Sequence, residues 1–240
     1  MSARNVRRPL PGWLLDEVAS AGRENLDVAH IASYDDKEDA SAAEEVALLR
    51  SLGLAATAVV VDMGAGTGQF TVAVAPVCAR VVAVDVSPVM LDALRTKVAA
   101  AGVDNVEVVQ AGFLTYEHTG EPADLLYSRY ALHHLPDAWK AVALTRMRRV
   151  LRPGGLLRLW DVVYGFEPRD AEQRLEAWCS TGSDGSDGAW TRADLEEHVR
   201  DEHSTFTWLL EPMIEHAGFS IENASHSKDG IFARYLLRAG

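Results

Sequence analysis

The sequence has few cysteines and little basic charge, and each shortage argues against a class of protein. Only Cys78 and Cys179 occur in 240 residues, far apart and outside any C-x-x-C pair, so neither a disulfide framework nor a metal site is expected. Lys and Arg number 23 against 35 Asp and Glu, which gives a formal net charge of −12. A surface of this sign repels phosphate backbones, so we expect no nucleic-acid partner.

The sequence also has no long apolar run. No stretch approaches the roughly 20 residues that a membrane-spanning helix needs, so no membrane partner is expected. Arginines before Leu10 resemble the start of a signal peptide, but Pro9 and Pro11 interrupt the apolar residues and an acidic pair follows at 16–17. We therefore expect a cytoplasmic protein with an N-terminal arm.

Apolar segments that alternate with helical segments make up most of the chain. With 48% hydrophobic residues, a chain of this length can form one large domain with a sizeable core. Strands are predicted at 58–63, 80–85, 105–110, 123–129 and 156–162. This alternation is typical of an α/β fold with a doubly wound, mostly parallel sheet. Two further runs, 219–226 and 231–238, predict an antiparallel hairpin at the C-terminal end.

A glycine turn follows the first of these strands, in the sequence VVVDMGAGTGQF at 59–70. Gly64, Gly66 and Gly68 allow the backbone to turn tightly and to approach a ligand. Asp85 ends the next apolar strand, so it is expected at the same sheet edge, where its carboxylate can accept hydrogen bonds from ribose hydroxyls. The third glycine comes one residue too early for the dinucleotide pattern G-x-G-x-x-G, and no lysine follows as in a P-loop. The pattern therefore predicts a nucleotide site of another kind and argues against a nicotinamide oxidoreductase.

The glycine turn and Asp85 resemble motifs I and II of the class I S-adenosylmethionine (SAM) methyltransferases. Further similar segments follow in the family's order: ADLLYS at 123–128, ALHHLPD at 131–137 and VLRPGG at 150–155. The last two are most similar to the ubiquinone/menaquinone-biosynthesis-like group, which includes many small-molecule methyltransferases. The resemblance covers residues 58–162. It implies a Rossmann-like sheet of seven strands, SAM as methyl donor and S-adenosylhomocysteine (SAH) as product.

The resemblance also implies which residues surround the cofactor. They are Tyr34, Asp62, Gly64, Ala65, Gly66, Gly68, Asp85, Val86, Met90, Gly112, Phe113 and Arg129. The glycine turn would face the methionine part and Asp85 the ribose, since Ser87 is available to cap the next helix in place of Asp85. Asp62 would orient the turn or meet the ammonium group. Tyr34 resembles an aromatic residue that covers SAM in relatives, although an exposed tyrosine beside an acidic run is an equally simple interpretation.

The adenine position departs from the family pattern. Many relatives carry an Asp after the third strand that receives the adenine amino group, whereas Gly112 stands here. We expect adenine to meet backbone groups and the Phe113 ring. An Asp at position 112 should then fit and strengthen SAM binding, unless the glycine is there for a φ above zero or for a close backbone approach.

Three residues are candidates for acid–base chemistry at the acceptor. His133 and His134 follow the fourth strand and Asp161 ends the fifth, so all three are expected at the carboxyl edge of the sheet. A histidine can remove a hydroxyl proton while the Asp fixes its tautomer, and we favour His134. A structural hydrogen bond is an equally open reading of either histidine. Arg129 could meet SAM or an acceptor carboxylate, or it could pair with Asp161 or Asp62.

Four segments are expected along the chain. They are an N-terminal helical arm or lid (1–45), a SAM-binding core (46–162), an insertion or lid (163–203), and a last helix with the hairpin (204–240). The arm and the insertion would cover the site, with Trp160, Tyr164, Trp178 and Trp190 as aromatic walls or as packing residues. We expect a monomer or homodimer that transfers a methyl group from SAM to a small molecule, mainly by positioning. A SAM-binding cyclase or a regulatory pseudoenzyme stays open.

Overall fold

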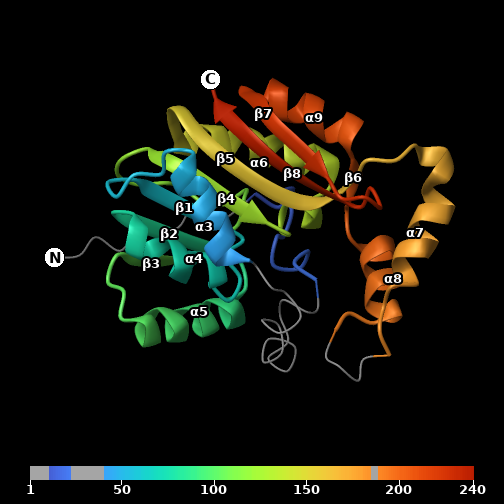
Figure 1. Ribbon diagram of the computed structural model, residues 1–240, viewed down its shortest axis with the longest axis horizontal. Coiled ribbons are helices and arrows are strands. Elements are labelled where there is room, and N and C mark those ends of the chain that lie inside the picture. The colour runs from blue at the N-terminus through green and yellow to red at the C-terminus, as the bar shows by residue number, and fades with distance from the viewer. Residues whose placement is uncertain (1–10, 23–40, 185–188) are drawn as a thin grey trace.

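The computed structural model describes residues 11–22, 41–184 and 189–240, and it is built around one large sheet (Figure 1). The strands lie in the order β3-β2-β1-β4-β5-β8-β7, and β6 pairs with β5 off this path. Their bounds are β1 Val59–Met63, β2 Arg80–Asp85, β3 Val106–Gln110, β4 Ala123–Arg129, β5 Leu151–Tyr164, β6 Thr205–Phe206, β7 Phe219–His226 and β8 Phe232–Ala239. The predicted α/β fold and the C-terminal hairpin are confirmed.

The directions of the strands determine where a ligand can bind. β1, β2, β3, β4 and β5 pair in parallel, and β8 runs antiparallel to both β5 and β7. β1 has β2 on one side and β4 on the other, so the strand order reverses at β1. In open α/β sheets, the crevice at such a reversal, beyond the carboxyl ends of the strands, is where ligands bind.

Helices cover both faces of the sheet, so β1 and β2 are buried on both sides. Val60 packs in a cluster with residues of α3 (Ala42–Ser51) and α4 (Gln69–Val74). Its neighbour Val61 points to the opposite face, toward α6 (Asp137–Val150) and α9 (Thr207–His216). The helix α5 (Pro88–Ala101) packs against β2 through Leu91 and Leu94. Continuous β-branched runs are therefore the sequence signal of a strand between two helical layers.

Two details of the elements follow from local chemistry. α5 begins as predicted, because Ser87 Oγ accepts a hydrogen bond from Met90 N (3.2 Å) and Pro88 occupies the first helical position. β5 is longer than the predicted 156–162: Leu151 pairs with Ala123, an irregularity follows, and regular pairing resumes at Leu156. Residues 151–155, from the segment that resembles the family motif VLRPGG, form the irregular first part of β5.

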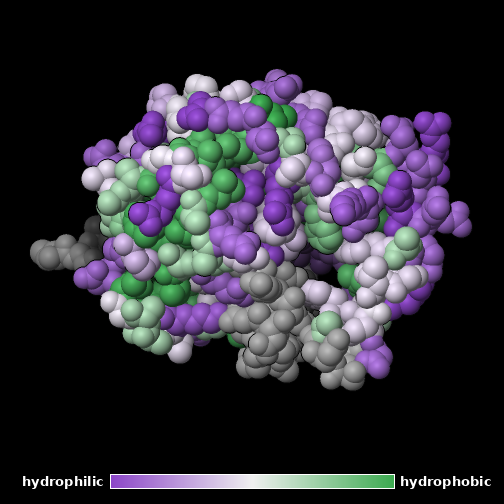
Figure 2. All heavy atoms as spheres, in the orientation of Figure 1, coloured by the Kyte–Doolittle hydropathy of each residue, from purple (hydrophilic) through white to green (hydrophobic). Residues whose placement is uncertain are grey.

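The insertion after β5 forms a lobe beside the sheet, with α7 (Ala171–Cys179) and α8 (Arg192–Asp201) (Figure 1). Its apolar cluster includes Tyr164, Trp178 and Leu195. The outer side of α7 is mainly hydrophilic, whereas hydrophobic residues gather over α3 and α4 (Figure 2). Among the described residues, no helix has both the length and the hydropathy needed to cross a membrane.

A buried ion pair joins α3 to the middle of the sheet. Arg158 of β5 donates to both carboxylate oxygens of Glu45, each at 2.8 Å. Both side chains are only 7% exposed. Because both charges are buried, each loses its hydration, and the interaction with the other charge compensates for that loss.

We expect Glu45→Ala to lower the free energy of unfolding by about 3–5 kcal/mol, because it leaves a buried guanidinium unpaired. Urea unfolding of the full chain, followed by circular dichroism, measures the change. Glu176→Ala is the matched control, since Glu176 pairs with Arg192 at the surface and should cost no more than about 1 kcal/mol. Equal losses in the two variants would contradict the prediction.

Candidate functional site

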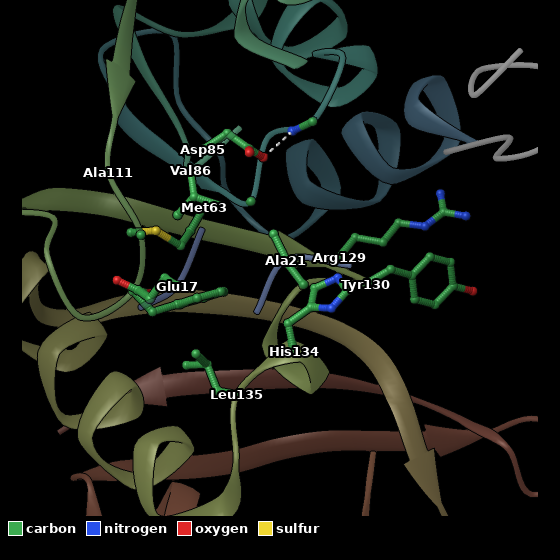
Figure 3. A pocket seen from close by; sticks show the side chains of 15 residues that line it. Glu17, Ala21, Met63, Asp85, Val86, Ala111, Arg129, Tyr130, His134 and Leu135 are labelled. Atoms are coloured by element: carbon green, nitrogen blue, oxygen red, sulfur yellow. Dashed lines mark hydrogen bonds between the residues drawn. The ribbon is translucent and has the colours of Figure 1, made fainter. Parts of the chain in front are cut away.

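A cavity lies at the carboxyl edge of the sheet, beyond the ends of β1, β2 and β4 (Figure 3). Its volume, part of it open to solvent, is about 590 Å³. The lining residues are Glu17, Ala21, Met63, Gly64, Gly66, Asp85, Val86, Ala111, Gly112, Phe113, Arg129, Tyr130, Ala131, His134 and Leu135. This is the crevice that the strand order predicts.

The turn after β1 brings backbone to the cavity wall. Gly64 and Ala65 donate their amide hydrogens to Val84 O, at 2.8 and 3.0 Å, which folds the turn back over β2. Gly64 has a φ of 74°, and a Cβ there would collide with the side chain of Ala131. Gly68 has a φ of 86° and lies against Leu94 of α5. Positive φ and close neighbours together explain why these positions carry glycine.

Asp85 links the end of β2 to this turn. Its Oδ2 accepts from Gly66 N and its Oδ1 from Ser87 N, both at 2.8 Å (Figure 3 shows the first). Burial raises the pKa of Asp85, and the two amides oppose that shift. The carboxylate therefore lies at the cavity wall with two backbone donors holding it in one orientation.

Asp62 lies behind the turn. It is buried, and its Oδ2 accepts a hydrogen bond from Thr71 Oγ1 of α4 at 2.6 Å. Burial raises the pKa of Asp62 to about 7, and the charge of Asp85 adds to the shift. Its contacts fit the predicted role of orienting the turn better than direct contact with a ligand.

The cavity wall between β2 and β3 is mainly apolar, with Val86, Ala111 and Phe113 along it. Gly112 lies against a carboxylate that sequence reasoning missed, that of Glu17: a Cβ on Gly112 would lie within 2.5 Å of Glu17 Cδ and both its oxygens. The expectation that an Asp would fit at position 112 is therefore wrong while Glu17 holds this place. Neither a positive φ nor a close backbone neighbour explains the glycine; the side chain of Glu17 does.

His133 and Asp161 form a buried pair just behind the cavity. Asp161 Oδ1 lies 2.5 Å from His133 Nδ1, and Oδ2 accepts from Leu132 N at 2.9 Å. The other ring nitrogen, His133 Nε2, lies 2.9 Å from Glu202 Oε2. Burial opposes the charge of the ring, but the two carboxylates raise the pKa of His133 to about 10. Burial likewise opposes the charge of Asp161, yet His133 holds its pKa below the usual range.

His134 has a different environment, although it adjoins His133 in the short 3-10 helix η2 (Leu132–His134). It lines the cavity (Figure 3). Burial and the neighbouring charge of His133 lower the pKa of His134 to about 3. At neutral pH, His133 is therefore an imidazolium between two carboxylates, and His134 is a neutral ring that faces the cavity.

Glu202 and His198, which sequence reasoning also missed, connect the insertion to this pair. Glu202 Oε2 lies 2.5 Å from His198 Nδ1, and His198 Nε2 lies 2.9 Å from Ser204 Oγ. His133, His198 and Glu202 place ligand-type atoms within 4.8 Å of one another. Contacts of 2.5 and 2.9 Å are shorter than the roughly 3.3 Å between ligand atoms in a tetrahedral zinc site, so the cluster has the geometry of an ion-pair network.

Aromatic residues next to the cavity act mainly in packing. Arg129 places its guanidinium carbon 4.1 Å from the Trp160 ring and 4.8 Å from the Tyr130 ring. Tyr130 adopts a φ of 49°, an uncommon conformation for a residue with a side chain. Of the residues expected as aromatic walls, Trp160, Tyr164 and Trp178 are buried outside the cavity lining, and Trp190 packs against the apolar cluster of the insertion.

The predicted site residues fall into three groups. Gly64, Gly66, Asp85, Val86, Gly112, Phe113, Arg129 and His134 line the cavity. Asp62, Ala65, Gly68, Met90, His133 and Asp161 lie outside its lining and support the turn, the helix α5 or η2. Tyr34 lies outside the described residues.

Comparison with known proteins agrees with this geometry. Residues 60–155 match a family described as a methyltransferase domain. An uncharacterised methyltransferase of Anoxybacillus flavithermus is 26% identical over 166 residues, which are 64% of this chain and 76% of the relative.

Solved structures share the fold. A SAM-dependent methyltransferase from Clostridium acetobutylicum superposes with a TM-score of 0.65 at 14% identity, covering 88% of this chain and 97% of that one. The 4+2 cyclase SpnF gives a TM-score of 0.62 at 15% identity, with 82% of this chain and 80% of that chain covered. The quinone-biosynthesis subgroup stays a prediction, and the matched domain, the relatives and the shared fold together support a class I SAM-dependent methyltransferase.

Proposed function

We propose that this methyltransferase transfers the methyl group of SAM to a small-molecule acceptor that enters beside His134. The observation that carries the proposal is that Asp85 and His134 line the same cavity. The cavity lining combines apolar side chains with a few polar groups, as small-molecule sites do. The excess of acidic residues, with a net charge of −12, also disfavours nucleic acid as the acceptor.

The residues of the cavity fit SAM. Gly66 has open space where a side chain would stand, and Asp85 offers a carboxylate that two amides keep in place. In this proposal Asp85 holds the ribose hydroxyls, and the turn holds the methionine part, oriented by Asp62 through Thr71. SAM, when bound, supplies an activated methyl group. The chain has only to position an acceptor in line with it and exclude water.

His134 is proposed to orient the acceptor. As a neutral imidazole it can accept a hydrogen bond from an acceptor hydroxyl or amine, and it can take the proton as the acceptor becomes methylated. A pKa of about 3 makes it a weak base, so proximity contributes more than proton removal. His133 is proposed as a positioning residue, because both of its ring nitrogens face carboxylates.

A SAM-binding enzyme without methyl transfer is the second candidate, since the fold is shared with the cyclase SpnF. The two candidate functions differ in whether the methyl group of SAM is transferred to the small molecule. Incubation of the full chain with small-molecule pools and SAM labelled in its methyl group should give a labelled acceptor and SAH. Conversion of a small molecule without label and without SAH would favour the cyclase.

The first prediction for this site concerns Asp85. We expect Asp85→Ala to weaken SAH binding about tenfold or more, because a charge-assisted hydrogen bond contributes about 1.5–3 kcal/mol. Calorimetry with the full chain measures it, and NAD should not bind. The control is Asp92→Ala on the exposed surface of α5. Unchanged affinity in Asp85→Ala would remove Asp85 from the ribose site.

The second concerns His134. We expect His134→Ala to lower turnover of the true acceptor at least tenfold, with less than a threefold change in SAH affinity. Because its pKa is about 3, the wild-type rate should not fall between pH 8 and pH 5.5 through protonation of this ring. If the wild-type rate changed with a pKa near 6.5 and this change disappeared in His134→Ala, the low pKa assigned to His134 would be wrong.

The third concerns the charged pair behind His134. The pKa of His133 is higher in the folded protein, about 10, than the roughly 6.5 of an unfolded chain. Its stabilisation is therefore complete below pH 6.5 and is lost as the pH rises toward 10. We expect His133→Gln to lower the free energy of unfolding by about 3–5 kcal/mol at pH 6 and by less at pH 9.5. A difference from wild type that grows with pH would refute this, and urea unfolding at both pH values measures it.

A further inference from the structure

Glu17 is a second carboxylate in the cavity wall, contributed by the N-terminal part of the chain (Figure 3). Residues 11–22 lie against the core, with Leu14 and Leu15 packed on its main apolar cluster. Trp13 stacks on Trp139 of α6, with ring centroids 6.3 Å apart. These contacts hold Glu17, which is only 8% exposed, in a defined place.

The contacts of Glu17 join it to the segment after β3. Leu114 N donates to both carboxylate oxygens at 3.1 Å, and Thr115 Oγ1 donates to Oε2 at 3.2 Å. Gly112 does not have a positive φ, so its backbone conformation does not require glycine. The reason for the glycine is space, since the carboxylate fills the place of its side chain.

The cavity between Asp85 and Glu17 has the chemistry of a site for a flat base. Its wall there is apolar, with Val86, Ala111 and Phe113. Burial raises the pKa of Glu17 although the Leu114 amide and the Thr115 hydroxyl oppose the shift. A further donor from a ligand would therefore find a desolvated acceptor, and an ionised carboxylate can only accept hydrogen bonds.

We propose that Glu17 recognises the exocyclic amino group of the adenine ring of SAM and SAH. Two carboxylates on the cavity wall then match the two sets of donors on an adenosyl group, with Asp85 for the ribose hydroxyls and Glu17 for the amine. Glu17 thereby selects an amino purine over an oxo purine, because an oxo group has no proton to donate and would face the carboxylate charge. This inference rests on the proposed cofactor orientation.

The test is calorimetry of the full chain at pH 8 with two ligands, SAH and S-inosylhomocysteine, in which an oxo group replaces the amine. We expect wild type to prefer SAH at least tenfold. Glu17→Gln keeps the size and an accepting oxygen, but it should weaken SAH binding about tenfold. The side-chain amide of this variant can donate a hydrogen bond to the oxo group, so the ratio of the two affinities should shift toward S-inosylhomocysteine. Glu121→Gln, at an exposed position, should change neither affinity.

The outcomes separate this proposal from the proposed function. If wild type does not bind SAH, the cofactor site itself is wrong and the role of Glu17 falls with it. If wild type binds SAH with no preference over the inosine analogue, only the role of Glu17 is refuted. If Glu17→Gln weakens the binding of both ligands equally, Glu17 has a structural role. If the variant binds SAH more tightly, Glu17 blocks part of the site. Either result overturns the proposal.

A second set of variants tests the geometry. Gly112→Asp alone should weaken SAH binding, because the new side chain collides with Glu17. Glu17→Ala alone should weaken it by removing the acceptor. The double variant places a carboxylate on residue 112 in the space that Glu17 leaves, so it should bind SAH more tightly than either single variant. A double variant no better than Glu17→Ala would contradict the assigned position, provided that its thermal unfolding matches that of Glu17→Ala.

Discussion

The hydrogen bond from Gly66 N to Asp85 is the contact on which the arrangement of the site depends. It joins the turn after β1 to the end of β2, so that two neighbouring parallel strands present one continuous wall. The amide of Ser87 holds the other oxygen of the same carboxylate. Since that residue also caps α5, the turn, the strand and the helix are fixed relative to one another. A ligand at this edge meets a surface already organised before it binds.

A second constraint is electrostatic and lies behind the cavity. Asp161, His133 and Glu202 alternate in charge in a largely buried region. Asp161 belongs to the core sheet and Glu202 follows α8, so the charge of one imidazolium is shared between the core and the insertion. Burial together with this charge keeps His134 neutral. The insertion therefore affects the protonation of a cavity residue that it does not need to touch.

Sequence patterns predicted the parts of the molecule that depend on local order. Continuous apolar runs identified β1 and β2, and the end of a strand placed Asp85, because all parallel strands finish at one edge. Glu17 could not be predicted in this way. Its segment shows no periodicity, and its contact with Leu114 joins parts of the chain that lie far apart. His198 and Glu202 have helical i, i+4 spacing, but that pattern alone predicts only a surface pair.

The two adjacent histidines illustrate a further limit. From the sequence, His133 and His134 are near equivalents. In the structure their neighbours differ, because the His133 ring contacts two carboxylates and the His134 ring faces the cavity. The direction in which each ring points is decided by the backbone of η2, where Asp161 accepts from Leu132 N and His133 N. No pattern of residue types carries that information.

The fit between Glu17 and Gly112 has a consequence for how the chain can change during evolution. A side chain at position 112 and a long acid at position 17 compete for one volume, so residue 112 can gain a side chain only where residue 17 becomes smaller. An acid at position 112 is therefore compatible with a small residue at position 17 and not with Glu17. Divergence of the N-terminal segment is thereby linked to the sequence that follows β3.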